Sequence, residues 1–128
     1  MNHQRPVNLD LGSIKFPIMA IASILHRISG IVLFLGLPVM LYFLQQSLGS
    51  DASFIQMKRL FAIGAWHKLM LWAFGAAWWY HLLAGMRHLL MDMGIGETVH
   101  VARQSAWLVI GLSVIGVLMM GAGLWSVV

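Results

Sequence analysis

The sequence predicts an all-α integral membrane protein, with three transmembrane helices in an up-down bundle behind a short N-terminal interfacial segment. Sixty per cent of the 128 residues are hydrophobic and 9% are charged, against roughly a quarter charged in ordinary soluble domains. The apolar residues form long blocks instead of the one-sided stripe of a globular helix. A span needs about 20 residues, so we expect one transmembrane anchor domain (1–128) with spans near 22–45, 62–86 and 106–127.

The first apolar block is predicted to begin after Pro17, because proline suits the first turn of a helix. From Ile28 to Leu44 the block is free of charge, about 25 Å of helix and just long enough to cross. Arg27 is therefore expected near a headgroup boundary, with Ile18–Leu25 continuing the helix at that interface. Pro38 removes a backbone hydrogen bond and predicts a kink in this span.

Two polar segments separate the remaining apolar blocks. Residues Gln45–Lys58 contain glycine, serine and aspartate, which predicts a loop. A second block runs from Leu60 to Met86, and Met91–Ser105 is predicted to be the second loop. The third span, Ala106–Val128, holds no charged residue.

The distribution of basic residues predicts the orientation of the chain. Positive residues favour the cytoplasmic side, and the N-terminal side holds the majority, with Arg5, Lys15, Arg27, Arg87 and Arg103 against Lys58, Arg59 and Lys68. We therefore expect the N-terminus in the cytoplasm and the C-terminus in the periplasm of a bacterial inner membrane. Trp66 and Trp125 near the outer interface and Trp107 near the inner one agree with aromatic belts.

Composition also excludes several kinds of function. There is no cysteine, which rules out a disulfide framework and a thiolate-held metal or iron–sulfur site in this chain. The net charge of +4 comes from cations scattered between apolar blocks, so no nucleic-acid partner is predicted. The first ten residues lack the apolar core of a cleavable signal, and we expect none to be removed.

His81 is the clearest candidate for chemistry, because an ionisable group inside a membrane normally faces the bundle interior and has a partner. It lies about 9 Å below the expected inner interface, and small residues flank it on one helical face: Ala77, Ala84 and Gly85. One interpretation is an axial haem ligand whose small neighbours admit the macrocycle. The equally weighted alternative is a helix-packing stripe with a histidine hydrogen-bonded across helices.

His67 lies fourteen positions before His81, close to the same helical face and about 21 Å away. Membrane cytochromes with two haems use such a spacing, but they need a matching histidine pair on another helix. The first span offers His26 and the third offers none. One haem, shared with another chain that supplies the second ligand, is therefore favoured, and His67 is interpreted as an interfacial residue.

Ser23, His26 and Arg27 form a second constellation, spaced so that one helical face carries all three. A hydroxyl, an imidazole and a guanidinium at the inner interface could hold the polar head of a quinone, or Arg27 could pair with a haem propionate. The alternative is an arginine that snorkels to the interface beside a serine bonded to the backbone. Arg87 is interpreted as a topological anchor, and Asp92 as a helix-end residue that could pair with Arg87 or His88.

Three segments carry a resemblance to a known family. They are Arg5–Leu11, Ser23–Gly30 and His81–Asp92, and in this order and spacing they resemble the cytochrome b membrane-anchor subunit of succinate dehydrogenase over nearly the whole chain. The resemblance implies that His81 is one axial ligand of haem b, with the other from a second anchor chain. It also implies that Ser23 and Arg27 help to form the ubiquinone site, with His26 and Arg27 near the haem propionates.

The resemblance further implies a function within a larger complex. Electrons from succinate, oxidised at a flavoprotein subunit, would pass through an iron–sulfur subunit to ubiquinone at the inner membrane face, in the tricarboxylic acid cycle and respiratory electron transport. This chain would anchor the complex and would not be catalytic alone. Two alternatives remain: the anchor of a related fumarate reductase, or a small transporter or assembly protein without redox chemistry.

Overall fold

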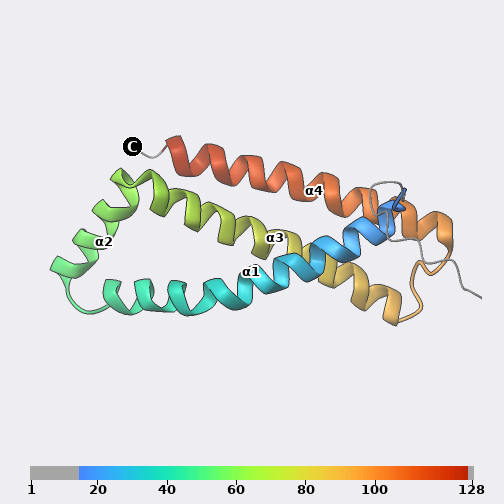
Figure 1. Ribbon diagram of the computed structural model, residues 1–128, viewed down its shortest axis with the longest axis horizontal. Helices are drawn as coiled ribbons and strands as arrows, with labels where there is room; N and C mark the ends of the chain where they lie inside the picture. Colours follow the sequence, from blue (N-terminus) through green and yellow to red (C-terminus); the bar gives the residue numbers. More distant parts are fainter. Residues whose placement is uncertain (1–14, 127–128) are drawn as a thin grey trace, which may run out of the picture.

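The computed structural model describes residues 15–126, which form four α-helices and no strand. These are α1 (Ile18–Ser47), α2 (Asp51–Ile63), α3 (Ala65–Asp92) and α4 (Val99–Ser126). The three long helices run up, down and up, and α2 crosses one end of the bundle (Figure 1). Helix α3 packs against both α1 and α4. The all-helical class is therefore confirmed.

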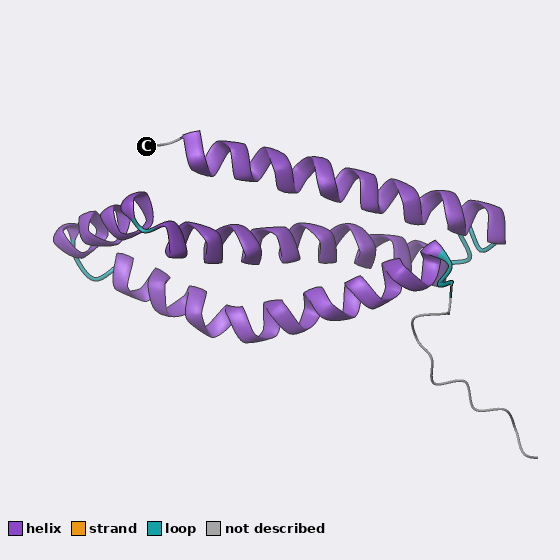
Figure 2. Cartoon of the chain, turned by 45° about the horizontal axis from the view of Figure 1, so that its top comes forward, coloured by secondary structure: helices purple, strands orange, loops and turns teal. Residues whose placement is uncertain are grey.

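Helix α1 begins where the sequence predicts. Pro17 precedes it in an extended conformation, as expected for a residue that cannot donate within the first turn. The helix runs without a break through His26 and Arg27, so Ile18–Leu25 continues the same helix. Pro38 lies inside α1, and Figure 2 shows this helix bowed. The Arg5–Leu11 motif lies outside the described residues, as does most of the expected N-terminal interfacial segment.

The first polar segment corrects the prediction, because all of it except residues 48–50 is helical. Helix α2 starts at Asp51, inside the expected loop Gln45–Lys58. Ser50 and Ser53 form a reciprocal cap: the Ser50 hydroxyl accepts from the Ser53 amide at 3.1 Å, and the Ser50 amide donates to the Ser53 hydroxyl at 2.9 Å. Two orphan amides at the helix start are thus satisfied.

The second apolar block is also not one continuous helix. It breaks at Gly64, where α2 and α3 meet at 90°. A Cβ at this position would lie 2.8 Å from the Leu60 carbonyl oxygen and 2.5 Å from Nδ1 of His67, so only glycine lets the backbone turn this tightly. At the other end of α3, Gly94 and Gly96 adopt φ values of +79° and +81° in a turn much shorter than the predicted loop Met91–Ser105.

Length and apolar composition identify α1 and α4 as candidate membrane spans, and α2 with α3 as a third candidate if the bent pair counts as one broken span. The structure therefore supports two or three spans. Its buried apolar core consists of small residues, namely Ala22, Ala84, Ala102, Ala106 and Val109. Large side chains point outward, as in Phe34 at 78% exposure, and close packing through small residues is typical of helices in membranes.

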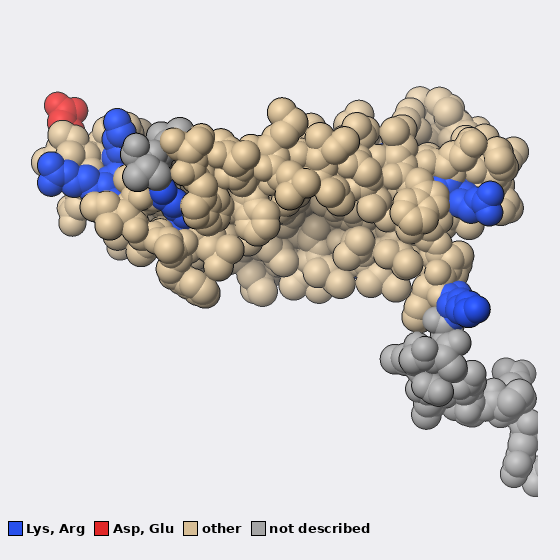
Figure 3. Space-filling view, turned by 90° about the horizontal axis from the view of Figure 1, so that it is seen from above, with Lys and Arg blue, Asp and Glu red and all other residues tan. Residues whose placement is uncertain are grey.

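Charged side chains lie at the two ends of the bundle. In the space-filling view, lysine and arginine gather at both ends and the length between them carries neither sign of charge on the face shown (Figure 3). This separation is what a bilayer requires, since charges near its centre are costly.

Candidate functional site

A cluster of three histidines lies between α1 and α3. The rings of His26 on α1 and His81 on α3 are stacked, with centroids 4.1 Å apart and planes 24° from parallel. His88 lies two turns beyond His81 on α3. Its ring also approaches His26, with the two centroids 5.1 Å apart and the planes tilted by 42°. The antiparallel course of α1 and α3 thus brings the two sequence-predicted segments together at one end of the bundle.

His81 is bonded across the helices through Nδ1. This atom lies 3.1 Å from Oγ of Ser29 and 3.2 Å from the carbonyl oxygen of His26. The Ser29 hydroxyl itself donates to that same carbonyl at 2.8 Å. Within residues 15–126, Nε2 of His81 makes no hydrogen bond. Ser29 was not singled out from the sequence, although it stands inside the Ser23–Gly30 motif.

Two glycines leave room for the imidazole rings of His81 and His26. A Cβ at Gly30 would lie 3.2 Å from Cε1 of His81, and a Cβ at Gly85 would lie 3.5 Å from Nε2 of His26. The flat group beside Gly85 is thus an imidazole of α1, and Ala84 is buried at 2% exposure. Within the described residues, Gly85 and Ala84 therefore pack inside the bundle beside histidines of both helices. This arrangement is compatible with a ligand role for His81, because the bond uses only one of the two ring nitrogens.

The constellation on α1 is only partly brought together. Arg27 is exposed and Ser23 is half-buried, and neither side chain makes a hydrogen bond within the described residues. His26 turns instead toward α3, where its Nε2 is buried and has no partner in the described part of the chain. Tyr80 fastens this region, since its hydroxyl donates to the Ala22 carbonyl at 2.8 Å.

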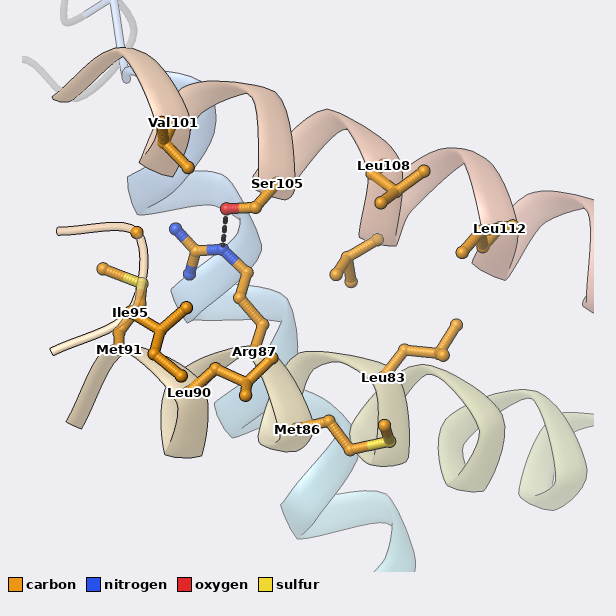
Figure 4. Close-up of a pocket in the computed structure, with 12 residues that line it drawn as sticks. Leu83, Met86, Arg87, Leu90, Met91, Ile95, Val101, Ser105, Leu108 and Leu112 are labelled. Carbon is orange, nitrogen blue, oxygen red and sulfur yellow. Dashed lines mark hydrogen bonds between the residues drawn. The ribbon is translucent and has the colours of Figure 1, made fainter. Parts of the chain in front are cut away.

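Arg87 is more than a topological anchor, because its side chain is buried at 8% exposure. Its Nε donates to Oγ of Ser105 at 2.9 Å and its Nη2 to the carbonyl of Ala102 at 3.0 Å, so it ties α3 to α4. Figure 4 shows the guanidinium pointing toward Ser105 from α3. Asp92 is exposed at the end of α3.

Arg87 lies beside a cavity of about 270 Å³ between α3 and α4. Its lining is almost wholly apolar and consists of Leu83, Met86, Arg87, Leu90, Met91, Ile95, Gly96, Val101, Ser105, Leu108, Val109 and Leu112. In Figure 4 the aliphatic and thioether side chains surround the arginine stem. Arg87 and Ser105, the polar side chains of this lining, bond each other and so join α3 to α4.

His67 lies at the opposite end of α3 from the histidine cluster, beside the elbow at Gly64. Its ring meets Phe43 and Phe61 edge-on, with centroids 6.3 Å and 5.9 Å away, and its Nδ1 is buried without a partner among the described residues. No group of three or more His, Asp or Glu side chains suited to a metal ion occurs in residues 15–126. The three clustered histidines are thus arranged by ring stacking and not as a chelating set.

The fold and this site define a small helical membrane protein that packs imidazole side chains between two helices near one end of its bundle. The comparisons identify the family: the model for the succinate dehydrogenase/fumarate reductase transmembrane subunit matches residues 1–120, and the chain belongs to this family. The resemblance inferred from the sequence motifs is thereby confirmed.

Three similar proteins share one name, succinate dehydrogenase cytochrome b556 subunit. That of Coxiella burnetii (strain RSA 493 / Nine Mile phase I) is 46% identical over 125 residues, which cover 98% of this chain and 100% of the relative. That of Rickettsia typhi (strain ATCC VR-144 / Wilmington) is 34% identical over 113 residues, 88% of this chain and 87% of the relative. That of Paracoccus denitrificans is 33% identical over 113 residues, 87% of this chain and 85% of the relative.

Proposed function

We propose that this chain is the cytochrome b membrane-anchor subunit of a succinate:quinone oxidoreductase, respiratory complex II. Family membership and the names of the relatives support a membrane subunit of this dehydrogenase complex that is not catalytic alone. The family description also covers fumarate reductase, and the three relatives named above favour the succinate dehydrogenase. The observation that carries the site is His81, held across helices through one ring nitrogen.

His81 is proposed as one axial ligand of haem b, and its surroundings fit that role. Imidazole is a common haem ligand, and a ligating histidine typically engages its second nitrogen with a carbonyl or other acceptor. His81 does so toward the His26 carbonyl, which leaves Nε2 for iron. The haem, when bound, supplies one-electron redox chemistry. The second ligand is proposed to come from a second anchor chain, because His67 lies at the other end of α3.

Ser23 and Arg27 are proposed to contribute to the ubiquinone site. The exposed Arg27 and half-buried Ser23 lie in the first turns of α1, where a neighbouring subunit can contact them. A guanidinium beside the quinone oxygens would stabilise the negative charge that develops during reduction. Arg27 and His26 are also proposed to lie near the haem propionates, since a guanidinium matches a carboxylate with two hydrogen bonds.

The proposed setting is the bacterial inner membrane, crossed three times with the N-terminus in the cytoplasm. Helix α3 lies antiparallel between α1 and α4 and matches their length (Figure 2), which supports α3 as the middle span. The cluster of His26 and His81 then faces the cytoplasmic side. The partners proposed there are the second anchor, the iron–sulfur subunit and the flavoprotein subunit.

The first experiment tests the ligand. In the complex purified in mild detergent, His81→Leu is expected to remove or strongly alter the haem b absorption spectrum, because an aliphatic side chain cannot bind iron. His67→Leu is the matched control on the same helix and is expected to leave the spectrum unchanged. An unaltered spectrum in His81→Leu would rule out this ligand. A purified complex with no haem at all would instead favour a transporter or assembly protein.

The second experiment tests the quinone site. Ser23→Ala and Arg27→Leu are expected to lower ubiquinone reduction by succinate, while succinate oxidation with an artificial electron acceptor survives. Arg103→Leu removes an exposed cation from α4 and serves as the control for loss of charge. Equal loss of both activities would show that the α1 variants impair assembly, and unchanged quinone reduction would exclude the proposed site.

A further inference from the structure

We infer that Ser29, together with the carbonyl group of His26, is a positioning pair that fixes the tautomer and ring orientation of His81. The inference rests on the proposed role of His81 as haem ligand and extends it to the groups that hold its imidazole. Ser29 is buried at 7% exposure and lies two residues after Arg27, on the face of α1 that meets α3.

The position of the proton follows from the donors and acceptors around Nδ1. A backbone carbonyl oxygen only accepts hydrogen bonds, and the His26 carbonyl lies 3.2 Å from Nδ1 of His81. Ser29 has one hydroxyl hydrogen, and its shortest bond, at 2.8 Å, donates that hydrogen to the same carbonyl. Toward His81, at 3.1 Å, Oγ therefore accepts. Nδ1 must carry the proton, and Nε2 keeps its lone pair.

The ring is also restrained on its faces. His26 stacks against it at 4.1 Å, and Gly30 lies close enough that a Cβ there would meet Cε1 at 3.2 Å. A half-turn of the ring about the Cβ–Cγ bond would put Cδ2 in the place of Nδ1 and so break both bonds at Nδ1. Ser29 and His26 thus hold both the proton and the direction of the ligand nitrogen.

This arrangement has a consequence for the electronic properties of the site. An N–H that donates to an acceptor makes the opposite ring nitrogen more basic, and such outer partners typically contribute 10–100-fold to metal affinity. Loss of the Ser29 acceptor leaves only the His26 carbonyl. We expect Ser29→Ala to weaken haem retention by about tenfold, the low end of that range, and to raise the haem midpoint potential because a less basic ligand stabilises the ferric state less.

The test compares three variants of the whole detergent-solubilised complex. Ser29→Ala removes the hydroxyl, and Ser29→Thr retains it and is expected to restore wild-type behaviour. Ser113→Ala is the matched control, since Ser113 is equally buried at 5% exposure but bonds only the Val109 carbonyl of its own helix, at 2.6 Å. The readouts are the haem midpoint potential, the ferric electron paramagnetic resonance spectrum and haem loss on dilution.

The expected result is a raised potential, a changed ferric spectrum and faster haem loss in Ser29→Ala alone. Identical values in Ser29→Ala and wild type would overturn the inference, as would the same change in Ser113→Ala. If Ser29→Ala does not assemble, Ser29→Cys replaces it, with a smaller shift expected from its weaker acceptor and no shift again overturning the inference. If the haem is unaffected in His81→Leu, the proposed ligand itself is overturned. If the haem is lost in His81→Leu but its properties in Ser29→Ala equal those of wild type, only this inference is overturned.

Discussion

Helix α3 packs against α4 on one side and α1 on the other, and the two interfaces use polar side chains differently. Toward α4, the indole nitrogens of Trp72 and Trp79 donate to the carbonyls of Val117 and Leu112 at 2.9 Å and 3.3 Å. Arg87 adds two further bonds at the end of the bundle where α3 turns into α4. Each of these donors has its acceptor within the chain, so the α3–α4 interface needs no other group.

The α1–α3 interface is different because it retains ring nitrogens that bond nothing in the described part of the chain. His26 buries its Nε2 without a partner, and His81 uses Nδ1 and leaves Nε2. A buried polar atom without a partner is costly, and in native proteins such atoms gather where a ligand or proton is handled. The polar groups of the α3–α4 interface thus bond each other, whereas the α1–α3 interface retains ring nitrogens that, among the described residues, are free for the proposed cofactor role.

The largest expected effect breaks the α3–α4 interface. A Cβ at Gly116 would collide with the indole of Trp79, so Gly116→Leu should destabilise the complex by about 3 kcal/mol or more, at the top of the range for overpacking. Thermal unfolding in detergent, followed by circular dichroism, measures the effect. Gly111→Leu is the control, since its Cβ meets nothing within 4 Å. Equal melting temperatures for the two variants would contradict the packing described here.

A somewhat smaller effect is expected at Arg87. Arg87→Met keeps much of the apolar stem and removes the charged donor to Ser105 and Ala102, and hydrogen bonds from charged groups contribute about 1.5–3 kcal/mol. The exposed Arg103 provides the control, as Arg103→Met. The melting temperature should fall in Arg87→Met alone, while the haem midpoint potential stays at the wild-type value. A shifted haem midpoint potential with an unchanged melting temperature would show that Arg87 acts on the haem and does not stabilise the α3–α4 interface.

Much of the fold could be predicted because the membrane imposes it. Long apolar blocks fixed the helical class, and Pro17 marked the start of α1 because its backbone cannot donate. The placement of His26 and His81 toward the same end of the bundle also followed, since antiparallel spans return the chain to the same side, but their ring stacking did not. These inferences use only local sequence and the thickness of the bilayer.

The elements that could not be predicted depend on weak or distant signals. The cap at Ser50 has serine at the position where glutamate or glutamine would mark a capping box, so α2 looked like a loop. The burial of Arg87 depends on Ser105 and Ala102, whose place opposite α3 is known only after α4 packs. Ser29 is a small polar residue in an apolar helix, and its role becomes visible only with His81 across the interface.

A smaller loss is expected at Trp72. Trp72→Phe retains most of the aromatic volume but removes the donor to the Val117 carbonyl, at a cost of about 0.5–1.5 kcal/mol for a neutral hydrogen bond. Trp78→Phe is the control, because Trp78 is 53% exposed. The melting temperature should fall slightly more in Trp72→Phe than in Trp78→Phe, with no change in the haem spectrum of either. A larger fall in Trp78→Phe would argue against the indole bond as a tie between helices.

The smallest expected effect on stability, at Gly30, tests the comparison most sharply. In Gly30→Ala the new Cβ lies 3.2 Å from Cε1 of His81 and should displace the ring by a few tenths of an ångström, while alanine favours the helix by about 1 kcal/mol over glycine. These contributions oppose each other, so the melting temperature should stay near the wild-type value, whereas in Gly123→Ala, whose Cβ meets nothing within 4 Å, the gain from alanine is unopposed. The haem midpoint potential and ferric spectrum should nevertheless change in Gly30→Ala. A lowered melting temperature with an unaltered haem would show that α1–α3 is a packing interface like α3–α4.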